Sequence, residues 1–194
     1  MRIAVSDLLF PGFRKFGIRP LNTEYGIEFF YEFGHDYYWD EETAAWGNRE
    51  FSIHGPCVAV DLADKDNLNY LPAFEATFKY AQKIKAQFVV VHTNECLPDD
   101  IKAGQELVIS RLAELLDMAK AYGVTLVIEN VGLRTKGNVL FTLEEYYALF
   151  ERFPQAMSLI DTGHAHVNGW DIPAVVEKLG DKLFAFHIHD NDGE

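Results

Sequence analysis

Short hydrophobic runs alternate along the chain with longer segments in which apolar residues recur every three or four positions. This alternation is typical of βα units arranged around a parallel sheet. The runs are rich in Val, Ile, Leu and Phe, as expected for strands that are buried on both faces. Seven of them are predicted as strands: Arg2–Ser6, Gly26–Tyr31, Phe51–His54, Phe88–His92, Leu126–Glu129, Ser158–Asp161 and Leu183–His187.

Four helices are predicted between the later strands from their start and stop signals. The signals are a proline in the first turn, Asp or Thr caps, and a Gly or Pro after the last turn. These helices are expected after Pro72, from about Asp100 to Tyr122 with Gly123 as the stop, from the Thr142 and Glu145 capping box to Pro154, and from Asp171 to Gly180. Residues 10–25 and 37–50 lack a clear apolar stripe, and they are predicted as loops or short helices.

Five successive predicted strands end abruptly in a polar residue. These residues are His54, His92, Glu129, Asp161 and His187. Consecutive βα units bring the carboxyl ends of their strands to the same end of the sheet, where active sites of parallel α/β folds form. One histidine at a strand end is most often a packing residue. Five polar ends in succession are hard to explain by unrelated packing needs, and they predict a shared site.

The two carboxylates of this set favour a bound cation. Burying Glu129 and Asp161 costs several kcal/mol for each unpaired carboxylate, and few basic residues lie near them in sequence. Two carboxylates with imidazole nitrogen suit Mn, Co, Zn, Mg or Fe(II), and the donor set does not choose among them. His187 and His189 are two apart and would face the same side of a strand, so either could ligate. His164 and His166 follow Gly163 and are predicted in a loop.

Composition narrows the class of protein. The 194 residues are 48% hydrophobic and 24% charged, as in a soluble globular protein, and no linker divides residues 1–194 into two domains. Lys and Arg number 17 against 30 Asp and Glu, and a net charge of −13 disfavours nucleic-acid partners. The N-terminus has no signal-peptide pattern, and no apolar run approaches the roughly 20 residues that span a membrane. Two cysteines without paired spacing fit reduced thiols, so a cytoplasmic location is expected.

Two weaker interpretations concern particular side chains. Cys57 lies three residues after His54, and a nucleophilic thiol there is a minor alternative because no base partner is evident. The aromatic residues between Phe29 and Trp39 are best explained by core packing, with a sugar-stacking wall as the minority interpretation. The signatures of dinucleotide binding, phosphate loops, serine hydrolases and zinc proteases are absent from the sequence.

The combined motifs resemble the xylose isomerase-like TIM-barrel superfamily, which includes sugar isomerases and epimerases, inosose dehydratases and apurinic-site nucleases of the endonuclease IV type. The resemblance extends over nearly the whole chain, from Arg2 onward. The residues that carry it are Gly26-Ile27-Glu28, Ile53-His54-Gly55-Pro56, His92, Ile128-Glu129-Asn130, Asp161-Thr162-Gly163-His164 and His187-Ile188-His189-Asp190. It implies an α/β fold of the TIM (β/α)8-barrel type.

The resemblance also implies roles for single residues. One divalent ion (Mn, Co, Zn or Mg) would be held by Glu129, Asp161 and His187, with a glutamate of an eighth strand as the fourth ligand. Glu129 would also move the substrate proton. Substrate contacts are expected from His54, His92, His164, Glu28 and His189. His189 with Asp192 has the same spacing as His187 with Asp190, so His189 stays an alternative ligand.

The chain stops at Glu194, just past the seventh predicted strand. We therefore expect a barrel that is truncated after this strand. The chain would then be a truncated gene product, or another chain would supply the missing element. Assembly into a homo-oligomer is a further possibility that the sequence leaves open. The expected function is a metal-dependent isomerase or epimerase that acts on a sugar, sugar phosphate or polyol through an enediolate. The alternatives are a multi-zinc phosphodiesterase of the endonuclease IV type, which the negative charge disfavours, and an inactive or ligand-binding barrel fragment.

Overall fold

A computed structural model describes residues 2–9, 17–32 and 34–188, and within them seven strands form one parallel sheet. The strand order follows the sequence, and every neighbouring pair is parallel. The strands are β1 (Ala4–Ser6), β2 (Gly26–Phe30), β3 (Phe51–His54), β4 (Val89–Val91), β5 (Leu126–Glu129), β6 (Met157–Asp161) and β7 (Leu183–His187). Every predicted strand is present, and the bounds differ by no more than two residues.

The four predicted helices are confirmed. They are α3 (Tyr70–Ile84), α4 (Ile101–Tyr122), α5 (Leu143–Arg152) and α7 (Ile172–Leu179). The carboxylate of Asp100 caps α4 by accepting a hydrogen bond from the amide of Ala103 at 3.0 Å. Thr142 and Glu145 form the capping box at the start of α5. The described residues also form three short 3-10 turns, which are η1 (Asp7–Leu9), η2 (Arg134–Lys136) and η3 (Gly180–Lys182).

Two of the helices in the described ranges, α2 and α6, were not predicted. Helix α2 (Asp36–Trp46) has 11 residues where loops or short helices were expected. Its buried stripe consists of Trp39, Glu42 and Trp46, and the acidic residue among the aromatic ones hides the periodicity in the sequence. Helix α6 (Thr162–Val167) contains His164 and His166, so the predicted loop at these histidines is wrong. Residues 10–16 of the other irregular segment lie outside the described residues.

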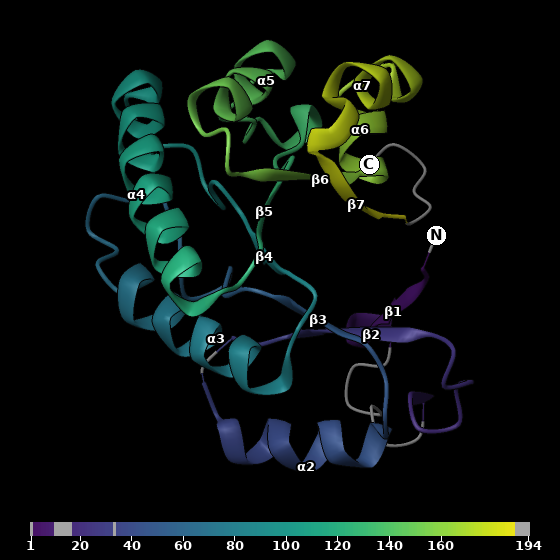
Figure 1. The fold of residues 1–194 in the computed structure, drawn as a ribbon. Coiled ribbons are helices and arrows are strands. Elements are labelled where there is room, and N and C mark those ends of the chain that lie inside the picture. Colours follow the sequence, from purple (N-terminus) through teal and green to yellow (C-terminus); the bar gives the residue numbers. More distant parts are fainter. Residues whose placement is uncertain (1, 10–16, 33, 189–194) are drawn as a thin grey trace.

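The sheet curls into a half-barrel with helices along its outer side (Figure 1). Because side chains alternate across a strand, one face of the sheet packs against the helices and the other faces inward. The large core between sheet and helices includes Phe29, Phe74 and Leu112, all fully buried. A smaller cluster on the inner face is formed by Val90, Val127 and Leu159. This is the seven-stranded, partly open barrel that the sequence predicted.

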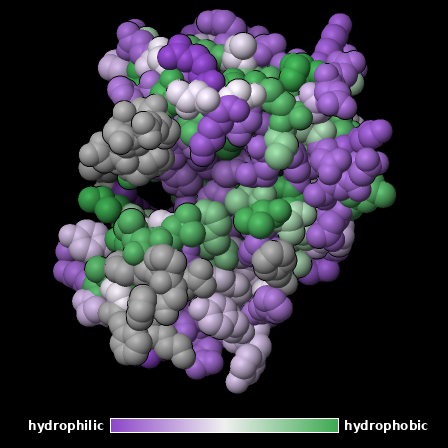
Figure 2. Space-filling model, turned by 180° about the vertical axis from the view of Figure 1, so that it is seen from behind, coloured by the Kyte–Doolittle hydropathy of each residue, from purple (hydrophilic) through white to green (hydrophobic). Residues whose placement is uncertain are grey.

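Within the described part of the chain, β1 and β7 are the two edges of the sheet, and they face each other across the side that the helices leave open (Figure 1). Seen from behind, this side is hollowed, with hydrophobic side chains along its lower wall (Figure 2). None of the helices in the described ranges is long and apolar enough to cross a membrane.

Candidate metal and active site

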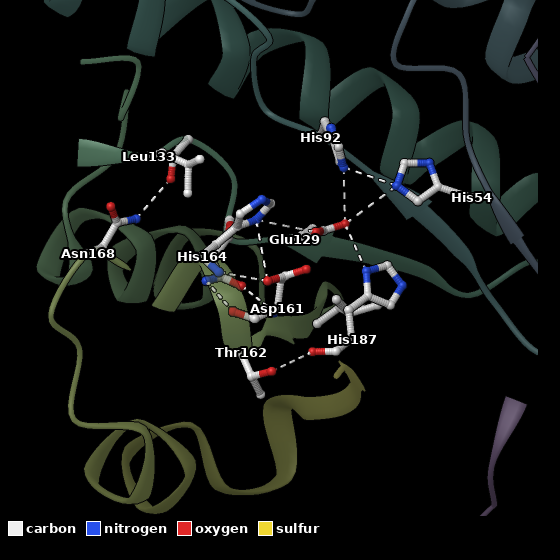
Figure 3. Close-up of polar contacts among 12 residues, drawn as sticks. His54, His92, Glu129, Leu133, Asp161, Thr162, His164, Asn168 and His187 are labelled. Atoms are coloured by element: carbon white, nitrogen blue, oxygen red, sulfur yellow. Dashed lines mark hydrogen bonds and ion pairs between the residues drawn. The ribbon is translucent and has the colours of Figure 1, made fainter. Parts of the chain in front are cut away.

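Glu129 lies at the centre of a histidine cluster at the carboxyl ends of the strands (Figure 3). Its side chain is buried, with the residue only 2% exposed. The carboxylate oxygen Oε2 lies 3.1 Å from Nε2 of His92, 3.4 Å from Nδ1 of His187 and 3.6 Å from Nε2 of His54. The other oxygen, Oε1, lies 3.6 Å from Nδ1 of His164. The structure thus brings histidines from the ends of β3 and β7, from the residue after β4 and from helix α6 around one carboxylate.

Asp161 lies beside this cluster, at the end of β6 (Figure 3). Asn130, the residue after Glu129, binds both backbone groups of Asp161: its Oδ1 accepts from the amide at 2.6 Å and its Nδ2 donates to the carbonyl at 3.2 Å. Oδ1 of Asp161 accepts from the amide of His164 at 2.7 Å and caps α6. Nδ1 of His164 lies 3.0 Å from the carbonyl oxygen of Asn130. Asn130 was part of a recognised motif, but sequence reasoning assigned it no role.

The buried hydroxyl of Tyr146 forms hydrogen bonds with residues of both β5 and β6. The Tyr146 hydroxyl on α5 lies 2.8 Å from the carbonyl oxygen of Ile128, 3.1 Å from that of Leu159 and 2.7 Å from Oγ of Ser158. Ile128 and Ser158 are paired in the ladder between the two strands. Tyr146 therefore fixes the spacing of the strands that carry Glu129 and Asp161.

His187 belongs to β7 and directs Nδ1 at Glu129, while its other ring nitrogen, Nε2, contacts Glu28 of β2. Nε2 lies 2.7 Å from Oε1 of Glu28, a residue that is only 6% exposed. The second Glu28 oxygen, Oε2, accepts from the Ser52 hydroxyl at 3.0 Å. The Thr162 hydroxyl donates to the backbone carbonyl of His187 at 3.1 Å. Both oxygens of Glu28 thus contact protein groups, while its predicted contact with substrate stays a prediction.

His92 and His54 form the other wall of the cluster. Their Nε2 atoms are 3.0 Å apart. Nδ1 of His92 lies 2.7 Å from Oε1 of Glu95, and Nδ1 of His54 lies 2.9 Å from the carbonyl oxygen of Gly55. The ring of Phe30 stacks on His54 with centroids 3.9 Å apart. Sequence reasoning missed Glu95, although its spacing of three residues from His92 is a usable signal for a local pair.

The cluster shifts the protonation of its members. Burial alone would raise the pKa of Glu129, but the positive field of His92 and hydrogen bonds from His187 and His54 hold it well below the usual range. Burial opposes charge on the imidazoles, yet Glu129 and Glu95 raise the pKa of His92 to about 10. Hydrogen bonds to Glu129 and Glu28 likewise raise the pKa of His187 to about 11. Glu129 is therefore a carboxylate at neutral pH, the form that binds a cation.

The donor set fits a divalent metal ion. Among the described residues, every ion pair of Glu129 is made with histidine and none with Lys or Arg. Glu129, Asp161 and His164 each offer a ligand atom, and these atoms lie within 4.8 Å of one another. A second group with the same property consists of His54, Cys57 and His92. Carboxylate oxygen and imidazole nitrogen together are ligands for Mn, Co, Zn or Mg. His189, the alternative ligand, lies outside the described residues.

Cys57, which lies near His54 and His92, is buried, with the residue only 7% exposed. Burial raises the pKa of its thiol, and the carboxylates of Glu95 and Glu32 raise it further. A protonated thiol is a poor nucleophile, so the structure disfavours that interpretation of Cys57.

One pocket among the described residues is lined by histidines of the cluster, and a larger one lies beside Phe30, whose ring stacks on His54. The larger, of about 550 Å³, is mainly apolar and is lined by Leu8, Phe30, Glu32, His35, Tyr38, Trp39 and Val58. The smaller, of about 170 Å³, is lined by His92, Asn94, Glu95, Val131, Gly132, Leu133, Lys136, Asn138 and His164. Phe29 and Tyr31 are core residues, as the packing interpretation expected, whereas Phe30 lines a pocket and stacks on a site histidine. A sugar-stacking role for these aromatic residues stays a prediction.

The chain belongs to the xylose isomerase-like TIM-barrel family, whose family model matches residues 26–194. An uncharacterized protein of Methanocaldococcus jannaschii, MJ1614, is 24% identical over 152 residues, which are 75% of this chain and 57% of that protein. The chain therefore spans little more than half the length of this curated relative.

Solved structures of sugar epimerases share the fold. A D-tagatose 3-epimerase-like protein is 20% identical with a TM-score of 0.77, and the match covers 100% of this chain and 78% of that one. A D-psicose 3-epimerase in the presence of D-fructose is 18% identical with a TM-score of 0.75, over 96% and 72% of the two chains. These likenesses confirm the fold class predicted from the sequence.

Proposed function

We propose that this chain carries the metal-binding and proton-transfer site of a sugar isomerase or epimerase, whose substrate is a sugar, sugar phosphate or polyol. The observation that carries the proposal is the environment of Glu129: a buried, ionised carboxylate beside Asp161, with four imidazoles around it. The sugar 3-epimerases among the structural neighbours support the class of substrate.

Glu129, Asp161 and His187 would hold one divalent ion. The choice of His187 is supported by its far nitrogen, which lies on the buried carboxylate of Glu28. Metal-ligating histidines usually have such a partner, which fixes the tautomer and the ring orientation. His164 is less suited through Nδ1, because this atom is engaged with the carbonyl of Asn130. When bound, the ion would act as a Lewis acid that polarises the carbonyl and hydroxyl oxygens of the substrate.

Glu129 would accept the proton from the carbon atom next to the substrate carbonyl, which leaves an enediolate. Its low pKa keeps it in the basic form, and its burial keeps competing water away. His92 and His164 line the smaller pocket and would contact substrate hydroxyl groups. His54, stacked under Phe30, would contribute from the side of the larger pocket.

Phosphodiester hydrolysis with several metal ions is the second candidate. The group of His54, Cys57 and His92 favours it, because a second ion there would lie next to Glu129. A net charge of −13 opposes it, since a phosphodiester polymer would be repelled. The number of bound ions separates the candidates: one supports the isomerase, and two or more support the hydrolase.

Hydrogen exchange at the substrate tests the proposal directly. The chain is loaded with Mn²⁺ and incubated in D₂O with D-fructose or D-tagatose, and after removal of the metal the loss of the C3 proton signal is followed by NMR. We expect exchange with the wild-type chain and a loss of at least 100-fold in Glu129→Gln, because a general base contributes about 10²–10⁴ in rate. Glu144→Gln, an exposed charge on α5, is the matched control and should exchange normally. Absence of exchange in the wild-type chain, or equal rates in Glu129→Gln, would contradict the proposal.

A further inference from the structure

Glu95 is a carboxylate outside the metal-binding set that nevertheless reaches the cluster. It lies in the loop after β4, and its Oε1 is 2.7 Å from Nδ1 of His92. The opposite nitrogen of the same ring, Nε2, is 3.1 Å from Oε2 of Glu129. The imidazole of His92 therefore spans two carboxylates, one from its own loop and one from β5.

The backbone around Glu95 is fixed by side chains of neighbouring loops. Nδ2 of Asn138 donates to the carbonyl of Glu95 at 3.2 Å, and the amide of Cys96 donates to Oδ2 of Asp61 at 3.0 Å. Asn138 is itself held, because its Oδ1 accepts from the amide of Leu133 at 2.8 Å. These bonds tie the loop after β4 to the loops after β3 and β5, and they hold the backbone from which the Glu95 side chain extends to His92.

We propose that Glu95 is a positioning residue for His92, which holds the imidazole in the orientation that directs Nε2 at Glu129 and at the adjoining pocket. The proposal deepens the proposed function, since it rests on His92 as a substrate-contacting residue there. The torsion that turns a histidine ring has broad minima, so a ring without a partner at Nδ1 can rotate. His54, whose Nε2 lies 3.0 Å from that of His92, offers a competing partner for the turned ring.

If the Glu95–His92 ion pair served only to stabilise the fold, removing Glu95 would mainly lower the stability of the protein. The Glu95 side chain is 39% exposed and that of His92 is 16% exposed. An ion pair with a partner this exposed contributes little to folding stability. Removing Glu95 should therefore change the state of the His92 ring much more than it changes the stability of the protein.

The His92 ring can be observed without any assay of activity. The full chain is labelled with ¹⁵N-histidine and loaded with Mg²⁺, and long-range ¹H–¹⁵N spectra are recorded; His92→Asn assigns the signals. We expect Glu95→Ala to shift both ring nitrogens of His92, whereas Glu95→Gln, which keeps an acceptor for Nδ1, stays close to wild type. Asp99→Asn, which removes an exposed charge from the same loop, is the control and should leave the signals unchanged. Superimposable His92 signals in Glu95→Ala and wild type would overturn the proposal.

Two further readouts separate this proposal from its alternatives. Glu95→Ala should unfold at the same temperature and bind Mn²⁺ as tightly as Asp99→Asn, while kcat for exchange at the substrate falls about tenfold, the lower range for loss of a supporting partner. A large loss of thermal stability confined to Glu95→Ala would mean a structural role and refute positioning. If wild type shows no exchange but the His92 signals still shift, the proposed function fails and the role of Glu95 stands.

Discussion

Glu28 and His187 are 159 residues apart in the chain, yet Oε1 of Glu28 lies 2.7 Å from Nε2 of His187. The pair connects β2 to β7, which approach each other only because the sheet curls (Figure 1). It also holds the second nitrogen of His187 toward Glu129 at 3.4 Å. One contact thus links the closure of the sheet to the geometry of the candidate metal site.

Glu28→Ala should weaken metal binding by roughly 10–100-fold, the usual loss when a partner of a ligating histidine is removed. Without Glu28, the ring of His187 is free to turn away from Glu129. The measurement is calorimetric titration with Mn²⁺, and Glu41→Ala, an exposed charge on α2, is the control. An unchanged affinity in Glu28→Ala would show that the pair only supports the sheet.

Tyr146→Phe should lower the free energy of unfolding by about 1–3 kcal/mol, because buried polar groups lose their partner. The hydroxyl lies 2.7 Å from Oγ of the fully buried Ser158 and also contacts the carbonyls of two strands. Urea unfolding measures the loss. Tyr147→Phe on the same helix is half-buried and should change stability by less than about 0.5 kcal/mol. Equal values for both variants would contradict the role given to Tyr146.

Stability of the protein stripped of metal with a chelator should fall as the solution becomes alkaline. The pKa of His92 is raised to about 10 and that of His187 to about 11. A raised pKa in the folded state gives stabilisation that is complete below the unfolded-state pKa of about 6.5 and is lost as pH rises through the folded value. Urea unfolding between about pH 7 and pH 9 should therefore show declining stability, with a smaller slope in His187→Asn. Rising stability over this range would contradict the pKa shifts.

Much of the fold could be predicted because buried strands leave a direct mark on the sequence. Val89–Val91 is entirely buried, and strands buried on both faces are typically runs of apolar, often β-branched residues. Caps at Asp100, Thr142 and Asp171 were equally readable, since each supplies a side-chain acceptor for a free amide. Helix α2 could not be found in this way, because Glu42 is buried within its aromatic stripe.

The proximity of the candidate site residues was predictable as far as strand ends determine it. Glu129, His54, His92, Asp161 and His187 are near one another because parallel strands deliver their last residues to one edge. The contacts that these residues make with loop residues, or across the curled sheet, could not be predicted from the sequence. Glu95 contacts His92 from a loop whose backbone is bound by Asn138 and Asp61. The pairing of Glu28 with His187 depends on how far the sheet curls, a property that spacing along the chain does not reveal.

Titration of the purified chain with Mn²⁺, followed by calorimetry, tests the central claim most directly. The account predicts one ion per chain, with binding lost in Asp161→Asn and His187→Ala and retained in His164→Ala, whose Nδ1 is engaged by Asn130. Two or more ions per chain, no binding by the wild-type chain, or binding that depends on His164 and not on His187 would contradict it.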